Sequence, residues 1–250
     1  MKKVYYIAIT VLLLGCNGEN VPDCFQNAGS IVQEEFIVNS FDKITVFERI
    51  ELIIKEGVDQ KVIVETGEYL LNDIEVYVEN GRLILKNDNG CNLTRDYGVT
   101  KVFVSVSNLT EIRNSSGLTV SSDGVLNFDN LLLKSDDFGL EDGVYHTDGD
   151  FDLEVNSESI VIVTNDLSNI FMSGSVENIN IGFFSGDGRF EGRDLIAQNI
   201  TIFHRGSNDM ILNPQQSLTG EIRSTGDVIS INQPPVIDVE EFYTGQLLFN

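Results

Sequence analysis

A group of acidic and basic residues between positions 187 and 209 has the side-chain types needed to cleave an acidic polysaccharide: Asp187, Arg189, Arg193, Asp194, His204, Arg205 and Asp209. Enzymes that cleave such polymers place two or three carboxylates, or an arginine or lysine base, on one solvent-facing surface. A second interpretation is that these residues only occupy the outward positions of an acidic protein. We favour it because the strong negative charge of the chain would repel a uronate substrate. We therefore assign no catalytic residue.

A run of alternating aspartates could bind calcium. Asp148, Asp150 and Asp152 are spaced as at the start of an EF-hand loop. Leu153, however, stands where the loop needs a turn glycine, and Ser159 stands where it needs a glutamate. Alternation would also place the three carboxylates on one face of a strand, where they make a solvated surface that resists aggregation. We therefore predict no calcium site.

The first cysteine carries a different chemistry, that of lipid attachment. Lys2-Lys3 form a short basic region, Val4–Leu14 is an apolar run, and Gly15 directly precedes Cys16. The apolar run has about half of the roughly 20 residues that a helix needs to cross a bilayer, so a secretion signal is the better interpretation. The pattern looks like a bacterial lipoprotein signal. That resemblance implies diacylglycerol on the Cys16 sulfur and removal of residues 1–15.

The other two cysteines, Cys24 and Cys91, are an even pair in a chain that the signal sends to an oxidising compartment. A disulfide is the default there. Two unrelated buried thiols are the alternative, and a metal site is disfavoured because neither cysteine has a histidine or another cysteine nearby. A bridge would fasten the start of the folded region to a point far along the first half of the chain. Loop entropy gives such a bridge about 4 kcal/mol of stabilisation.

Composition limits the remaining functions. The 250 residues are 42% hydrophobic, which is enough for a core in one large or two small domains. Lys and Arg number 16 against 39 Asp and Glu, and the net charge of −23 argues against nucleic acid or an anionic lipid surface as partner. Common metal- and phosphate-binding motifs do not occur, and His146 and His204 do not fall at a repeating spacing. We predict no metal and no cofactor.

Short β-branched segments separated by turns predict strands in the first half of the chain. They are Phe36–Val38, Ile44–Phe47, Ile50–Ile54, Val62–Val64, Ile74–Val78 and Leu83–Leu85. Between the last two, Asn80-Gly81 supplies the two positive φ angles of a two-residue hairpin turn. The stretch from Glu68 to Asp73 is the one helix candidate, and it is too short to be stable alone.

Glycine-bearing corners recur in the second half of the chain. Their spacing is nearly constant from Gly117 to Gly139, from Gly186 to Gly206 and from Gly206 to Gly226, and the longer gap between Gly139 and Gly186 would hold two slightly longer units. A period of roughly 20 residues is typical of a solenoid. Strands of successive coils would then pair in parallel and share one apolar stack, as in a parallel β-helix. Six residues are candidates for inward positions above one another: Ile112, Leu133, Leu153, Ile181, Ile202 and Ile222.

Several short motifs together resemble the "putative auto-transporter adhesin" head domain family, also called the head GIN domain. In order they are Phe41–Ile44, Val78–Leu85, Cys91, Tyr97, Leu109–Ile112, Ser116-Gly117, Leu218–Val228 and Pro234-Pro235. The resemblance covers residues 36–240. The segment from Gly139 to Gly186 departs from the pattern, because Asp-Phe-Gly and Asn-Ser-Glu-Ser replace its Ser-Gly corners.

The resemblance implies an exported lipoprotein or secreted protein of Gram-negative bacteria, with a right-handed β-helix and no established activity. We therefore expect an all-β right-handed parallel β-helix (solenoid), entered through a β-hairpin or meander region. The expected divisions are a signal peptide at 1–15, a lipidated spacer at 16–30 and one domain at 31–250. Within that domain, the segment 31–97 would form the opening strands and 98–240 the repeated coils.

The functional hypothesis follows from these expectations. The protein would be held in the cell envelope by acylated Cys16, most simply at the outer membrane, and would present a non-enzymatic adhesion or interaction surface to an unknown protein or glycan. The alternative hypothesis is a carbohydrate-active β-helix enzyme, a polysaccharide lyase or hydrolase. The two differ in surface, because an enzyme needs a cleft in which arginine, histidine and carboxylate side chains converge.

Overall fold

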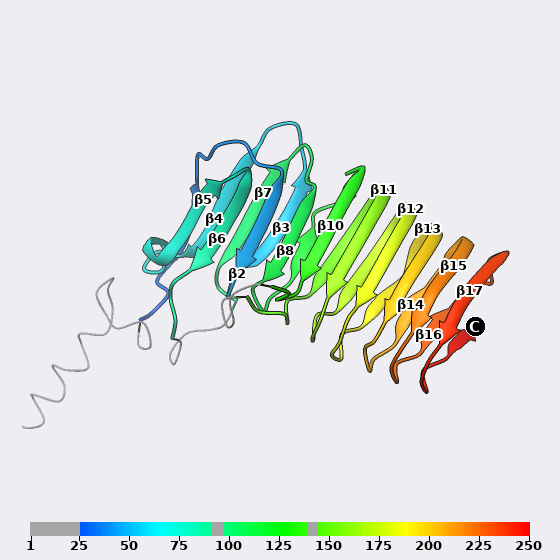
Figure 1. Cartoon of the computed structure of the whole chain (residues 1–250). Helices are drawn as coiled ribbons and strands as arrows, with labels where there is room; N and C mark the ends of the chain where they lie inside the picture. Colours follow the sequence, from blue (N-terminus) through cyan, green and yellow to red (C-terminus); the bar gives the residue numbers. More distant parts are fainter. Residues whose placement is uncertain (1–25, 92–97, 140–144) are drawn as a thin grey trace, which may run out of the picture.

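The computed structural model describes residues 26–91, 98–139 and 145–250, which form one curled sheet of 18 strands with mixed pairing (Figure 1). The chain is thus all-β as expected. The described residues contain no α-helix, and the helix candidate at 68–73 is only a 3₁₀ turn at Leu71–Asp73. None of their helices could cross a membrane. The signal at 1–15, Cys16 and Cys24 lie outside these residues.

Strands of both directions make up the first part of the sheet. They are β1 (Ile31–Glu35), β2 (Lys43–Phe47), β3 (Glu51–Glu56), β4 (Lys61–Gly67), β5 (Ile74–Glu79), β6 (Arg82–Asn87) and β7 (Lys101–Val106). Strand β4 pairs antiparallel with β1 and β7, whereas β2 and β3 pair in parallel with β6 and β7. The β5–β6 hairpin turns at Asn80 (φ 51°) and Gly81 (φ 74°), which confirms the predicted turn.

The second part of the sheet pairs in parallel throughout. Its strands are β8 (Glu111–Ser115), β9 (Val120–Ser122), β10 (Asn130–Ser135), β11 (Phe151–Thr164), β12 (Ile170–Phe183), β13 (Phe190–His204), β14 (Met210–Leu212), β15 (Pro214–Ile222), β16 (Val228–Ser230), β17 (Val236–Glu241) and β18 (Leu247–Phe249). From β11 onward, the sequence separation between paired residues is nearly constant, as in Ile160–Ile179 and Ile200–Leu218. The period seen in the sequence therefore reflects strand pairing between successive turns of the chain.

Close backbone approach explains the glycines that marked this period. At Gly186 (φ 89°) a Cβ atom would lie 2.0 Å from the carbonyl oxygen of Asp166, and at Gly226 it would lie 2.1 Å from that of Asn208. A side chain cannot fit at either corner. Asp166 lies at the corner between Gly139 and Gly186. The long gap in the glycine spacing therefore does hold two turns of the chain, and the first of these turns is the longer.

The six predicted core residues are all buried, at 2% exposure or less. Their predicted stacking is only partly right. One column runs through Ile112, Leu133, Ile162, Ile181, Ile202 and Gly220. Leu153 instead pairs with Met172, and Ile222 pairs with His204. The predicted column is wrong at these two residues for two reasons. The turn before Asp166 is longer than those that follow it, and the sequence separation between paired residues of β13 and β15 is smaller than that between the earlier strand pairs.

Candidate functional site

The charged residues between positions 187 and 209, which the sequence analysis did not assign to catalysis, are not gathered into one cluster of acids and bases. Arg189 contacts Glu191 (Nη2–Oε2 3.0 Å) and lies 4.0 Å from Asp209, while Arg193 lies 3.8 Å from Glu191. Asp187 accepts a hydrogen bond from Ser207 at 2.7 Å. Sequence reasoning missed Glu191, although its alternation with Arg189, which directly precedes β13, and with Arg193 was a usable signal. These side chains form a surface ion network in which each carboxylate already has a partner.

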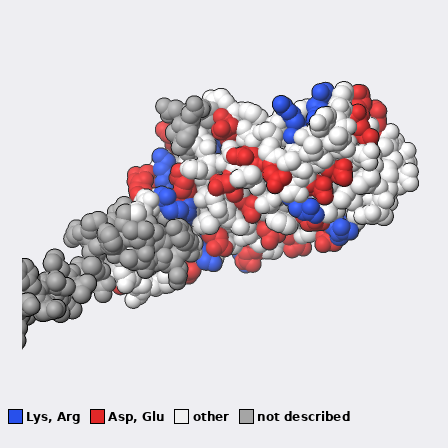
Figure 2. All heavy atoms as spheres, turned by 90° about the horizontal axis from the view of Figure 1, so that it is seen from below, with Lys and Arg blue, Asp and Glu red and all other residues white. Residues whose placement is uncertain are grey.

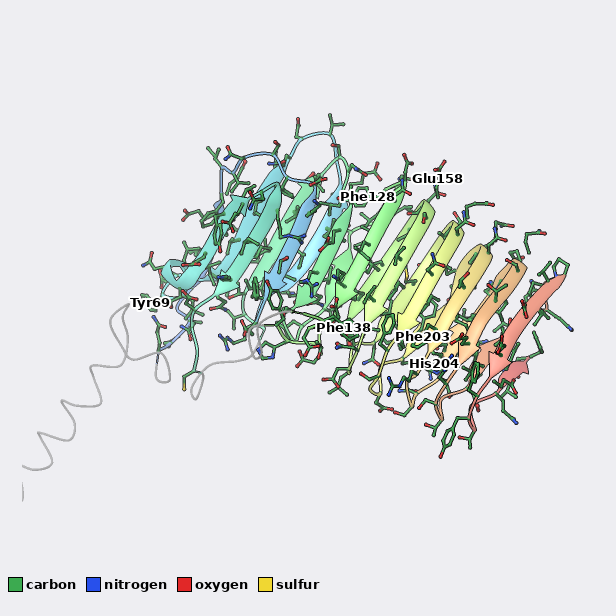
Figure 3. The ribbon with its side chains drawn as sticks, in the orientation of Figure 1. Tyr69, Phe128, Phe138, Glu158, Phe203 and His204 are labelled. Carbon is green, nitrogen blue, oxygen red and sulfur yellow. The ribbon has the colours of Figure 1, made fainter. Side chains whose placement is uncertain are left out.

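The remaining members of that group lie elsewhere. Asp194 is exposed and pairs in register with Ser173, and Arg205 is exposed beyond the end of β13. His204 is fully buried, and its ring lies 6.3 Å from that of Phe183 (Figure 3). Because side chains alternate along a strand, outward Phe203 turns His204 into the core. His204 therefore cannot reach a substrate.

The burial of His204 should make folding stability sensitive to acid. Desolvation lowers its pKa from the ordinary value of 6.5, against the opposing effects of the Asn208 backbone and of the carboxylates of Asp209 and Asp227. Above pH 6.5 the ring is neutral in both states. Below it the unfolded chain binds a proton that the folded ring rejects, so folding stability falls as the pH drops toward the lowered pKa.

Replacing His204 by leucine should therefore reduce the loss of stability between pH 7.5 and pH 5. Urea unfolding of wild type and His204→Leu at both pH values measures this loss of stability. The carboxylates titrate in both proteins, so their contribution cancels in the comparison. His146→Gln is the matched control: His146 is exposed and contacts Glu48 at 2.8 Å. Identical pH dependence in wild type and His204→Leu would contradict this account of the buried ring.

The aspartate run does not form a calcium site. Asp148 precedes β11 and Asp152 is exposed on it, so the expectation that all three share a strand face is wrong. Asp150 already accepts hydrogen bonds from the backbone N–H and side-chain amide of Asn169, at 2.7 and 3.2 Å. Among the described residues no cluster of three or more His, Cys, Asp or Glu could hold a metal ion.

An outward row of aromatic and arginine side chains is a more distinctive surface. We call it the aromatic ridge, and it consists of Phe138, Phe184, Phe203, Arg223 and Phe242. The rings of Phe184 and Phe203 stack at 5.0 Å, and Phe138 meets Phe184 edge-on at 5.4 Å. The guanidinium of Arg223 lies 4.1 Å from the ring centre of Phe242 and 5.8 Å from that of Phe203. Figure 3 labels Phe138 and Phe203 along the lower side of the sheet.

The parallel register builds this ridge. Phe184, Arg223 and Phe242 each follow directly on the last residue of a strand, of β12, β15 and β17. The backbone N–H of each donates to the preceding turn, for example Arg223 to the carbonyl of His204 at 2.7 Å. Equivalent positions of successive turns thus lie side by side. Phe138 and Phe242 remain about half exposed, at 52% and 50%.

A shallow apolar hollow adjoins the ridge. Its volume is about 200 Å³, and Val161, Val163, Gly182, Phe184 and Phe203 are among its lining residues. At Gly182 a Cβ atom would lie 2.6 Å from the ring of Phe184, so a side chain there would displace that ring. A second hollow of about 310 Å³ shares Val161 and extends over β10. Together with the ridge they give an apolar strip across several turns of the chain.

Charge sets this strip apart from its surroundings. Acidic side chains are spread over the length of the face shown in Figure 2, and basic ones are fewer. Arg205 and Arg223 follow β13 and β15 at equivalent positions, next to the stacked rings. Arg223 forms an ion pair with Glu221, whereas Arg205 is exposed and has no ion-pair partner among the described residues. An arginine without a partner on so acidic a protein is a natural contact for an anionic group.

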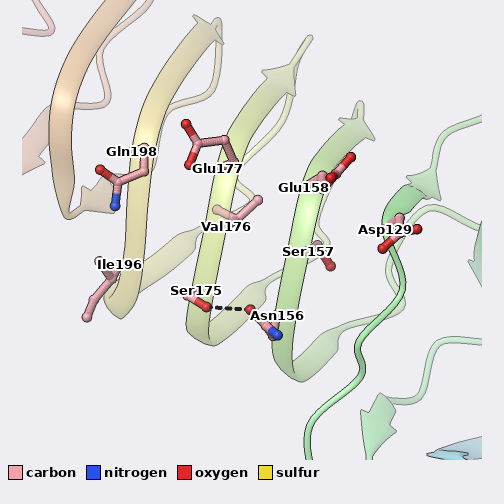
Figure 4. Close-up of a pocket in the computed structure, with 9 residues that line it drawn as sticks. All are labelled: Asp129, Asn156, Ser157, Glu158, Ser175, Val176, Glu177, Ile196 and Gln198. Carbon is pink, nitrogen blue, oxygen red and sulfur yellow. Dashed lines mark hydrogen bonds between the residues drawn. The ribbon is translucent and has the colours of Figure 1, made fainter.

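A polar hollow lies on the opposite edge of the same turns (Figure 4). It has a volume of about 280 Å³ at the bends of the long strands, and Ser175 donates to the amide oxygen of Asn156 at 2.9 Å. Its carboxylates, Asp129, Glu158 and Glu177, have no arginine or histidine among the other lining residues. This hollow offers carboxylate and amide oxygens that could accept hydrogen bonds from a ligand.

Known structures resemble this fold closely. A crystal structure of a "putative adhesin" from Bacteroides fragilis shares 16% identity, with a TM-score of 0.76 over 88% of this chain and 97% of that one. A "putative lipid binding protein" from Parabacteroides distasonis shares 14% identity (TM-score 0.63, 89% and 97%), and a "putative adhesin" from Parabacteroides merdae shares 12% (TM-score 0.63, 94% and 98%). At these identities the likeness concerns the fold alone.

The sequence family is established independently. No curated protein matches this chain. A family model described as "Putative auto-transporter adhesin, head GIN domain" matches residues 40–234, which is more than three quarters of the chain. That match agrees with the order of motifs found along the sequence. The chain belongs to the head GIN domain family of "putative auto-transporter adhesins".

Proposed function

We propose that this protein is a non-enzymatic binding protein of the bacterial cell envelope, and that its aromatic ridge contacts an unidentified protein or glycan on another surface. The observation that carries the proposal is the repetition of exposed aromatic and arginine side chains at equivalent positions of successive turns. Tyr, Trp, Phe and Arg are enriched in binding interfaces, whereas Glu and Asp, which outnumber Lys and Arg in this protein, are depleted. The neighbouring apolar hollow adds area that a ligand could cover.

The ridge, together with Arg205 beside it, predicts which substitutions reduce binding. A ligand is first identified by screening the pure protein on glycan and protein arrays. Phe242→Ala combined with Arg205→Glu should then lower the affinity for that ligand by tenfold or more. Hot-spot residues of this type cost about 1.4 kcal/mol or more when removed, and that energy corresponds to a factor of ten. Phe171→Ala combined with Arg193→Glu is the matched control, since Phe171 is similarly exposed (42%) and lies off the ridge. Equal losses in both variants would exclude the ridge as the contact surface.

We further propose that the turns from β11 to β18 form a right-handed parallel β-helix. Parallel pairing at a nearly constant offset supports this fold, because each strand then meets its counterpart in the next turn. Such a fold suits an adhesion role, since it builds a long surface from one repeated unit. The divisions at 1–15, 16–30 and 31–250 remain part of the proposal.

The envelope anchor rests on the signal at the amino end. We propose that acyl chains on Cys16 hold the protein in the outer membrane, since two or more chains suffice for stable anchoring. A disulfide between Cys24 and Cys91 would then fasten the tether to the folded domain. The oxidising compartment supports that pairing.

Cys16→Ser should convert the membrane-bound protein into an uncleaved or soluble exported form, because the substituted residue cannot carry the thioether-linked lipid. Detergent-phase partitioning of cell fractions measures the change, and Cys91→Ser is the control that retains the lipid site. Equal partitioning of Cys16→Ser and wild type into the detergent phase would refute the anchor.

A further inference from the structure

The sheet is open at its carboxy-terminal end. Strand β17 pairs only with β15, and β18 pairs only with β16, whereas every strand from β8 to β16 has neighbours on both sides. Figure 1 shows these strands as the last turn of the curled sheet. Each of the two strands therefore has one edge without a partner strand within the described residues. Unpaired edges are templates for further strand addition.

The apolar core is also uncovered at this end. Leu218 is fully buried, but Ile237, which pairs with it on β17, is 38% exposed. Ser230 is likewise buried, and Phe249, which pairs with it on β18, is 43% exposed. In the turns before, the next strand covers each such residue. Solenoids need a cap over their terminal turns, and these side chains have none within the described residues.

Charge determines which partner fits the open edge. Strand β17 carries Asp238, Glu240 and Glu241 and no basic residue. The carboxylate of Glu241 accepts the backbone N–H of Leu247 at 2.8 Å, whereas Asp238 and Glu240 alternate with the apolar residues and face solvent. A second copy of the chain would place the same acidic side chains beside them, and like charges on neighbouring strands are destabilising.

We infer that β17 is an acceptor edge for an extended segment of another protein, one in which apolar side chains alternate with lysine or arginine. The added strand would hydrogen-bond to the free edge of β17. Its apolar side chains would cover Ile237 and Val239, and its basic side chains would lie beside Asp238 and Glu240. Strand addition of this kind takes affinity from backbone hydrogen bonds and specificity from alternate side chains.

Synthetic peptides test the inference on the whole chain. The probe is a short fluorescent peptide, long enough to span β17, that alternates valine with lysine. One control has glutamate for lysine, and another has the same composition in a shuffled order. Anisotropy at physiological salt should show binding of the alternating lysine peptide at least tenfold tighter than of either control. Equal binding of the shuffled peptide would mean unspecific charge attraction and would overturn the inference, as would no binding at all.

Variants of the protein test whether the peptide binds at the free edge of β17. Asp238→Lys with Glu240→Lys, and separately Ile237→Lys, should each weaken the peptide by tenfold or more. Glu158→Lys with Glu177→Lys makes the same charge change at the polar hollow and should alter affinity less than twofold. Thermal melting shows that each variant is folded. Equal weakening by both double variants would overturn the assignment to β17. So would a concentration-dependent dimer in sedimentation that Ile237→Lys abolishes, because a second copy would then occupy the edge.

Discussion

Replacing Ile181 by alanine should lower the free energy of unfolding by about 2 to 5 kcal/mol. The side chain is 1% exposed on β12 and lies in the core column between Ile162 and Ile202. The loss has two parts, the transfer of the removed carbons to water and the cavity left behind. Backbone hydrogen bonds to both neighbouring strands prevent the column from closing that cavity.

Urea unfolding measures this loss, and Ile196→Ala is its matched control. Ile196 is 49% exposed on the adjacent strand β13, so the same substitution there should cost less than about 1 kcal/mol. Because Ile162 and Ile202 lie in the same core column, Ile162→Ala and Ile202→Ala should lower the free energy of unfolding by about as much as Ile181→Ala. Comparable stability of Ile181→Ala and Ile196→Ala would show that the inward register is wrong.

Replacing Arg113 by methionine should lower the free energy of unfolding by about 3 kcal/mol or more, because it leaves the buried carboxylate of Asp136 without its main partner. Asp136 is 1% exposed, and its carboxylate lies 3.4 Å from the Arg113 guanidinium. The guanidinium also donates to the carbonyl oxygen of Asp136 at 2.5 Å and lies over the ring of Tyr145. Lys134, 3.6 Å from the same carboxylate, is too exposed to replace it fully.

A second variant separates charge from packing. Arg113→Met combined with Asp136→Asn removes the unpaired charge and keeps an oxygen for the Phe138 N–H, so it should recover part of the loss. The exposed pair of Lys55 and Asp123, 2.7 Å apart, supplies the control, and Lys55→Met should cost less than about 1 kcal/mol. If Arg113→Met is no more costly than Lys55→Met, the buried pair does not hold β8 and β10 together.

The period and the tight turns of this fold could be predicted because they depend on local rules. Asn80-Gly81 specifies its hairpin through positive φ angles, and Gly186 and Gly226 mark corners where backbones approach closely. Stacking depends instead on the exact length of each turn. A bend inside β11, at the polar Asn-Ser-Glu-Ser stretch, separates Leu153 from Ile162, and the predicted column took the residue on the wrong side of it.

The candidate site was less accessible from sequence. Phe184, Arg223 and Phe242 follow the period of the turns, but they differ in residue type, and their relation appears only when each is counted from the end of its strand. His204 attracted attention as a possible base, but the alternation that exposes Phe203 buries it. Chemistry-bearing residue types were therefore a weaker guide here than strand register, which decides which side chains face solvent together.

Methyl nuclear Overhauser effects in protein labelled at isoleucine δ1 carbons test the central claim most directly, because the aromatic ridge exists only if successive turns stack in this register. Strands in a sheet lie about 4.8 Å apart. The account predicts cross-peaks between Ile162 and Ile181 and between Ile181 and Ile202, with a parallel series linking Ile160, Ile179 and Ile200. Absence of these cross-peaks, with contacts between residues of opposite strand order instead, would contradict the parallel turns and the ridge built on them.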